Sequence, residues 1–108
     1  MIFITGGSCQ GKVAFAKEQF PDRILMPAYQ FSVEKYVKEG KDPVEQTEAM
    51  MQMNPEVVII MSEMGCGMTP GKAEDRILRE QVGRVGCYLA DMADKVYRVT
   101  AGIGERIK

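Results

Sequence analysis

The residues best suited to chemistry are two glycines and a lysine near the start of the chain. Gly6 and Gly11 are separated by four residues, and Lys12 follows directly. This is the spacing of the nucleotide-binding loop, whose backbone N–H groups surround phosphates while its lysine reaches the outer ones. The motif continues with Ser or Thr, whose hydroxyl binds Mg²⁺, but this chain has Val13 there. The sequence therefore predicts nucleotide binding and leaves phosphoryl transfer as a separate question.

The predicted nucleotide site consists of the loop backbone and one ammonium group. We expect Lys12 to act as a catalytic residue that neutralises the outer phosphates of GTP or ATP, helped by the dipole of the following helix. The predicted nucleotide-binding residues are Gly6, Gly7, Ser8, Cys9, Gln10, Gly11, Lys12 and Val13. The simpler alternative is an ordinary turn between a strand and a helix, with a lysine at the surface.

A second candidate residue, Glu63, comes directly after the most apolar run of the chain, residues 57–61. That run predicts a buried strand. Ligands of open α/β sheets lie beyond the carboxyl ends of the strands, so Glu63 should project toward the same crevice as the glycine-rich loop. We predict that Glu63 is catalytic and holds Mg²⁺ or a water; the alternative is a carboxylate that only caps the following turn. The hydroxyls of Thr5 and Ser8 are substitute ligands for the metal.

The elements that must position these residues alternate between strands and helices. Apolar runs predict strands at residues 2–5, 23–26, 57–61 and 96–100, with a final edge strand near 105–108. Helical spacing predicts helices at residues 12–20, 32–38, 43–53 and 70–93. This order predicts an α/β fold, a three-layer sandwich around a mostly parallel sheet.

Local signals set several helix ends and faces. Asp42 followed by Pro43 predicts the start of one helix, and Thr69-Pro70 the start of the longest one. The residues expected to face the core from these helices are Val13, Ala16 and Phe20; Met50, Met51 and Met53; and Ala73, Ile77, Val82, Val85, Leu89 and Met92.

Composition limits the class of protein. With 108 residues, 45% of them hydrophobic, the chain suffices for one compact domain over residues 1–108. The net charge of -1 gives no footprint for nucleic acid. No segment approaches the roughly 20 apolar residues that span a bilayer, so we expect no membrane partner. The 3 cysteines form no C-x-x-C pair and histidine is absent, which favours a reduced, cytoplasmic setting without a zinc site.

Two blocks of sequence resemble the bifunctional adenosylcobinamide kinase / adenosylcobinamide-phosphate guanylyltransferase family of cobalamin biosynthesis. The first block is residues 2–12, which is similar to the family's Thr-Gly-Gly phosphate loop. The second comprises Ser62–Pro70, Arg79-Glu80, Gly83–Val85, Ala93–Val96, Gly102–Gly104 and Ile107-Lys108. The resemblance implies a RecA-like phosphate-loop NTPase fold, a cytoplasmic homo-oligomer, and a corrinoid, adenosylcobinamide, as the second substrate.

The chain also departs from the family pattern. It is shorter than the family's usual length, and residues 28–55 do not match the family's middle. The family's guanylyl transfer is understood to pass through a guanylylated histidine, and these 108 residues contain none, which excludes that route for them. Gly86-Cys87 stands where the family has Asn-Gln.

Two functional hypotheses follow. The first is a shortened family member that binds GTP or ATP and acts as a weak kinase on the aminopropanol side chain of a corrinoid, with Lys12 and Glu63 as its catalytic residues. The second is a nucleotide-binding or regulatory subunit that has kept the fold and lost the chemistry. Val13 and the missing histidine favour the second, and the intact Gly11-Lys12 pair and the segment Glu63–Gly67 favour the first.

Overall fold

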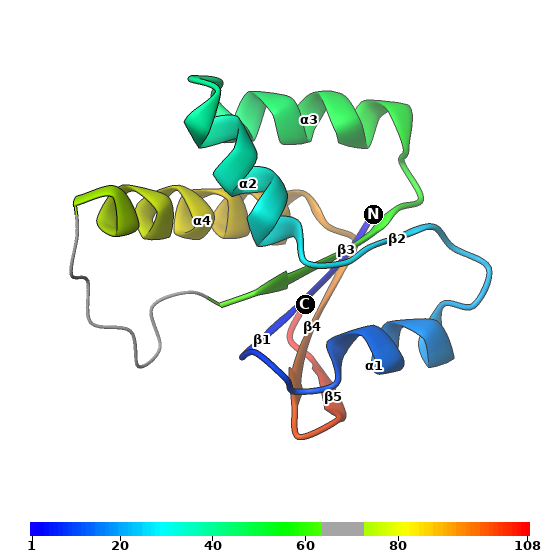
Figure 1. Cartoon of the computed structure of the whole chain (residues 1–108). Coiled ribbons are helices and arrows are strands. Elements are labelled where there is room, and N and C mark those ends of the chain that lie inside the picture. Colours follow the sequence, from blue (N-terminus) through cyan, green and yellow to red (C-terminus); the bar gives the residue numbers. More distant parts are fainter. Residues whose placement is uncertain (64–72) are drawn as a thin grey trace.

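A single five-stranded sheet organises the chain (Figure 1). The computed structural model describes residues 1–63 and 73–108. Over these residues the elements are β1 (Ile2–Gly6), α1 (Lys12–Gln19), β2 (Leu25–Met26), α2 (Tyr29–Lys38), α3 (Pro43–Met53), β3 (Val58–Ser62), α4 (Ala73–Met92), β4 (Lys95–Thr100) and β5 (Ile103–Arg106). The strand order is β2-β3-β1-β4-β5. All neighbouring strands are parallel except β4 and β5, which form an antiparallel hairpin.

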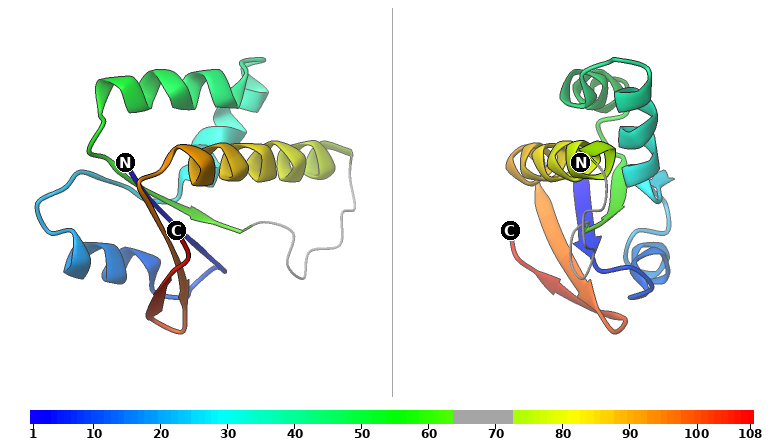
Figure 2. Two further views of the ribbon diagram at one scale, coloured as in Figure 1. Left: turned by 180° about the vertical axis from the view of Figure 1, so that it is seen from behind. Right: turned by 60° about the vertical axis from the view of Figure 1, so that its left-hand side comes forward.

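Helices cover both faces of the sheet, so the predicted three-layer α/β architecture is confirmed. Helix α1 lies on one face, α2 and α4 lie on the other, and α3 packs outside α2 and α4 (Figures 1 and 2). Alternate residues of β1 enter opposite cores: Phe3 packs on the α2 and α4 side, and Ile2 and Ile4 pack on the α1 side. This is the pattern of a central parallel strand, which is buried on both faces.

Helices α2 and α3 are joined by a buried polar contact. The hydroxyl oxygens of Tyr29 and Thr47 lie 2.8 Å apart, and the Thr47 hydroxyl also donates to the Pro43 carbonyl at 2.7 Å. Both side chains are buried, and burial raises the pKa of Tyr29 to about 12. The predicted cap of α3 is confirmed, because the Asp42 carboxylate accepts from the Val44 N–H at 3.0 Å.

Several predicted core positions are wrong. Val13 is 38% exposed, because α1 turns Phe15 toward the sheet instead, where its ring lies 5.4 Å from that of Tyr97. Met53 is 83% exposed, since it is the last residue of α3 and has passed the end of the core. Ile77 and Met92, near the two ends of α4, are about half exposed for the same reason.

Element bounds differ from the prediction chiefly at the edges of the sheet. Strand β2 has only 2 residues, and β5 begins at Ile103, two residues before the predicted edge strand. The helix start predicted at Thr69-Pro70 lies outside the described residues. Within residues 1–63 and 73–108, no helix combines the length and apolar character that a bilayer-spanning segment needs.

Candidate functional site

The glycine-rich loop connects β1 to α1, as the motif requires. Gly6 has a φ of +152°, and a Cβ there would collide with the Val99 carbonyl of the neighbouring strand. Gly11 has a φ of +83° and stands at the N-cap of α1. Both conformations favour glycine. The backbone thus turns sharply at both ends of the loop and leads directly into a helix N-terminus.

Lys12 is the first residue of α1 and lies against the loop. The residue is only 8% exposed, and its Nζ donates to the Gly7 carbonyl at 2.6 Å. Desolvation lowers the pKa of Lys12, while the nearby Cys9 and Glu63 act in the opposite direction. The ammonium group therefore bridges the concave side of the loop, where a phosphate could replace the carbonyl as its partner.

The loop is also fixed by the hairpin between β4 and β5. The Gln10 carbonyl accepts from the Gly102 N–H at 2.8 Å, and the Gln10 side-chain Oε1 accepts from the Ala101 N–H at 2.6 Å. Gln10 was expected to contribute to a phosphate cradle by its backbone, but no local pattern predicts its bond to the hairpin, because the partner lies 91 residues away. The side chain of Gln10 consequently supports the loop from the hairpin side.

A cavity of about 260 Å³ opens beside the loop. Its lining combines the loop with the start of α2 and the end of β3: Cys9, Gln10, Gly11, Lys12, Val13, Ala14, Pro27, Ala28, Gln30, Ile60 and Ser62. The first-turn N–H groups of α1 have no acceptor within their own helix, and no acidic residue stands in that turn. The positive end of the helix dipole is therefore available to an anion in this cavity.

Glu63 stands where β3 ends, beside the phosphate loop. Its backbone N–H donates to the Gly6 carbonyl at 2.9 Å. Its carboxylate forms a two-pronged ion pair with Arg98 of β4, with Nε to Oε1 and Nη2 to Oε2 both at 3.3 Å. Sequence reasoning did not find Arg98; only its place near the end of a strand adjacent to β1 could have suggested it. Both carboxylate oxygens are thus occupied in this conformation.

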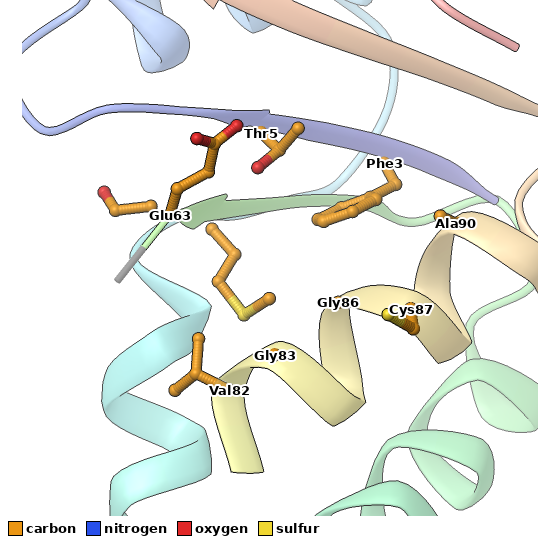
Figure 3. Close-up of a pocket in the computed structure, with 10 residues that line it drawn as sticks. Phe3, Thr5, Glu63, Val82, Gly83, Gly86, Cys87 and Ala90 are labelled. Atoms are coloured by element: carbon orange, nitrogen blue, oxygen red, sulfur yellow. The ribbon is translucent and has the colours of Figure 1, made fainter. Parts of the chain in front are cut away.

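A second, mostly apolar cavity of about 330 Å³ lies on the α4 side of the sheet. Figure 3 shows Glu63 and Thr5 at one end of it, with Phe3 along the sheet and Gly83 and Gly86 on the facing helix. Ser62 lines both cavities, whereas Glu63 lines this second cavity and not the one beside the phosphate loop. The polar side chains of Thr5 and Glu63 thus stand at one end of an otherwise apolar cavity.

The predicted magnesium site has one carboxylate and no motif hydroxyl. Val13 presents carbon where the motif has oxygen. Among the described residues, no cluster of three His, Cys, Asp or Glu side chains could hold a metal ion. Magnesium bound with nucleotides is usually held by one or two carboxylates, the substrate phosphates and water. Glu63 alone meets that modest requirement, provided that Arg98 releases it.

The mostly parallel sheet, the layers of helices and the glycine-rich loop are consistent with a reduced phosphate-loop NTPase. A family model described as cobinamide kinase / cobinamide phosphate guanyltransferase matches residues 29–107. The chain belongs to this family. The resemblance inferred from the sequence motifs is therefore confirmed, and the expectation that residues 28–55 depart from the family is corrected, since all but the first lie within the matched range.

Two curated relatives carry the same name, bifunctional adenosylcobalamin biosynthesis protein CobU. The protein from Salmonella typhimurium is 42% identical over 52 residues, and that from Escherichia coli is 40% identical over 52 residues. Each match covers 48% of this chain and 29% of the relative. The chain thus matches less than a third of each relative's length. The matched family range begins after the phosphate loop and does not include it.

Proposed function

We propose that this chain binds a nucleoside triphosphate, ATP or GTP, at the loop between β1 and α1. The observation that carries the proposal is the position of Lys12, nine-tenths buried at the first turn of α1 with its ammonium group across the loop. Incoming phosphates would exchange the Gly7 carbonyl contact for a charge-assisted one. The loop amides and the α1 dipole would take up the remaining phosphate oxygens.

The proposed reaction is a weak transfer of the γ-phosphoryl group to a hydroxyl of a corrinoid such as adenosylcobinamide. Family membership supports this choice of acceptor. Lys12 would stabilise charge on the transferred group, and Glu63 would hold Mg²⁺ or a water at the edge of the cavity. Magnesium, when bound, supplies neutralisation of charge on the outer phosphate oxygens. Glu63 reaches that role only by leaving Arg98.

A non-catalytic nucleotide-binding or regulatory role is the second candidate. Two observations favour it: Val13 lacks the hydroxyl of the motif, and both oxygens of Glu63 are paired with Arg98. Loss of the metal-binding hydroxyl weakens phosphoryl transfer more than nucleotide binding, because the metal acts chiefly on charge that develops in the transition state.

The test measures affinity and transfer separately. ATP and GTP affinities are measured by titration calorimetry for the unaltered chain, for Lys12→Ala and for Lys17→Ala, an exposed lysine of the same helix that serves as control. We expect Lys12→Ala to weaken binding about ten- to hundredfold, the range for a lost hydrogen bond to a charged group, and Lys17→Ala to change it little.

Transfer is then followed with γ-labelled ATP or GTP, Mg²⁺ and adenosylcobinamide. Label that appears on the corrinoid and disappears in Lys12→Ala supports the kinase. Measurable affinity without transfer supports the binding subunit, and absence of nucleotide binding by the unaltered chain refutes both.

A further inference from the structure

The cavity beside the phosphate loop has a second wall, formed by the start of helix α2. Gln30, in the first turn of that helix, lines the same cavity as Lys12 and Val13. The sequence around Gln30 carries no recognised motif, so its position was not predicted. What Gln30 offers to a ligand depends on which end of its amide group faces the cavity.

Gln30 is held in one amide orientation. Its Oε1 accepts a hydrogen bond from the backbone N–H of Ser62, at 3.1 Å, where β3 ends. A backbone N–H can only donate, so the atom bound there must be the oxygen, and the NH₂ group is left for other partners. Among the described residues, that NH₂ group has no acceptor. The side chain therefore presents two N–H donors whose direction the sheet has fixed.

The surroundings of Gln30 favour an anion. The α2 cap residue, Ala28, has no side-chain oxygen to satisfy the first-turn amides, and no acidic residue stands in that turn. The first turn of α1, on the opposite wall, also lacks an acidic residue. Two helix N-termini and the Lys12 ammonium thus border one cavity of about 260 Å³.

We propose that Gln30 binds the outermost phosphate of the nucleotide and thereby favours triphosphates over diphosphates. This inference rests on the proposed nucleotide binding. The loop amides surround the inner phosphates and the lysine reaches the outer ones. Gln30 lies outside the loop, bonded to Ser62 at the carboxyl end of β3, so its NH₂ group meets the part of the ligand that extends beyond the loop.

The substitution Gln30→Glu separates a ligand-binding role from a structural one. Glutamate keeps an oxygen for the Ser62 N–H, but it removes the NH₂ donor and adds a negative charge beside the phosphates. A glutamate in the first turn of a helix is favourable, so the variant should fold, which a thermal melt verifies. Gln52→Glu, at an exposed position of α3 away from this cavity, is the matched control for the added charge.

Affinities for ATP, ADP and inorganic tripolyphosphate are measured by titration calorimetry. We expect Gln30→Glu to weaken ATP and tripolyphosphate binding about ten- to hundredfold, to weaken ADP binding less, and Gln52→Glu to leave all three unchanged. ATP binding that is unchanged in Gln30→Glu, or ADP binding that weakens equally, overturns the assignment of Gln30 while nucleotide binding itself stands. An unaltered chain that binds none of the three ligands overturns both proposals.

Discussion

Replacing Thr47 by valine should remove the acceptor of the buried Tyr29 hydroxyl. The Thr47 proton is used by the Pro43 carbonyl, which can only accept, so the Tyr29 hydroxyl must be the donor to Thr47. Because the pKa of Tyr29 is about 12, that donor is protonated at neutral pH. Valine has nearly the shape of threonine, and the site is fully buried, so the principal losses are the two hydrogen bonds of the Thr47 hydroxyl.

We expect Thr47→Val to lower the free energy of unfolding by about 1–3 kcal/mol, the cost of leaving a buried polar group unsatisfied. In a domain of this size each kcal/mol corresponds to about 4–8 °C in Tm. Urea and thermal unfolding followed by circular dichroism measure both quantities. Tyr29→Phe removes the stranded hydroxyl, so Thr47→Val should cost clearly less in that background. An equal cost in both backgrounds would refute the reasoning, because the loss would then come from packing or from the bond between Thr47 and the Pro43 carbonyl.

Two further substitutions test the site and the cap of α3. Val13→Thr should change the free energy of unfolding by no more than about 0.5 kcal/mol, because the residue is partly exposed. It should increase label transfer from ATP with little change in ATP affinity. Unchanged transfer would show that the missing hydroxyl is not the limiting defect. The pKa of Asp42 is lowered by the hydrogen bond from the Val44 N–H, with a smaller contribution from Arg84. The ionised carboxylate therefore stabilises the fold above its unfolded pKa near 3.8, and this stabilisation disappears as the pH falls through the lower pKa of the folded state. Asp42→Asn keeps an oxygen for the cap but loses the negative charge. Its urea midpoint should therefore lie below that of the unaltered chain at pH 7 and converge with it in acid. A difference that persists in acid would contradict this assignment.

The sequence was most informative where a short local pattern has one structural solution. The glycine spacing before Lys12 placed a loop between a strand and a helix, and Asp42-Pro43 marked the start of α3 to the residue. The run at 57–61 identified a buried strand, and Glu63 follows it, with its backbone N–H bonded to the Gly6 carbonyl of the loop. These features depend on neighbours in the chain, so the sequence carries them directly.

Features that depend on distant contacts were missed. The partner of Glu63 is Arg98, 35 residues away, and the partner of Gln30 is Ser62, 32 residues away. Nothing in the local sequence of either pair announces the other member. The exposure of Val13 was missed for a related reason: helical spacing predicted Val13, Ala16 and Phe20 as the core face, and the contact between Phe15 and Tyr97 of β4 is not visible in the local sequence.

The bonds from Gln10 to the hairpin affect the order in which the site can form. The phosphate loop is near the start of the chain, whereas the turn that holds it, Ala101-Gly102, follows about ninety residues later. During synthesis the loop therefore emerges from the ribosome about ninety residues before its support. Until the hairpin turn is in place, the loop lacks two hydrogen bonds, one to the Gln10 carbonyl and one to the Gln10 side chain. Nucleotide should consequently bind late in folding, and stabilise only chains that have already closed the hairpin.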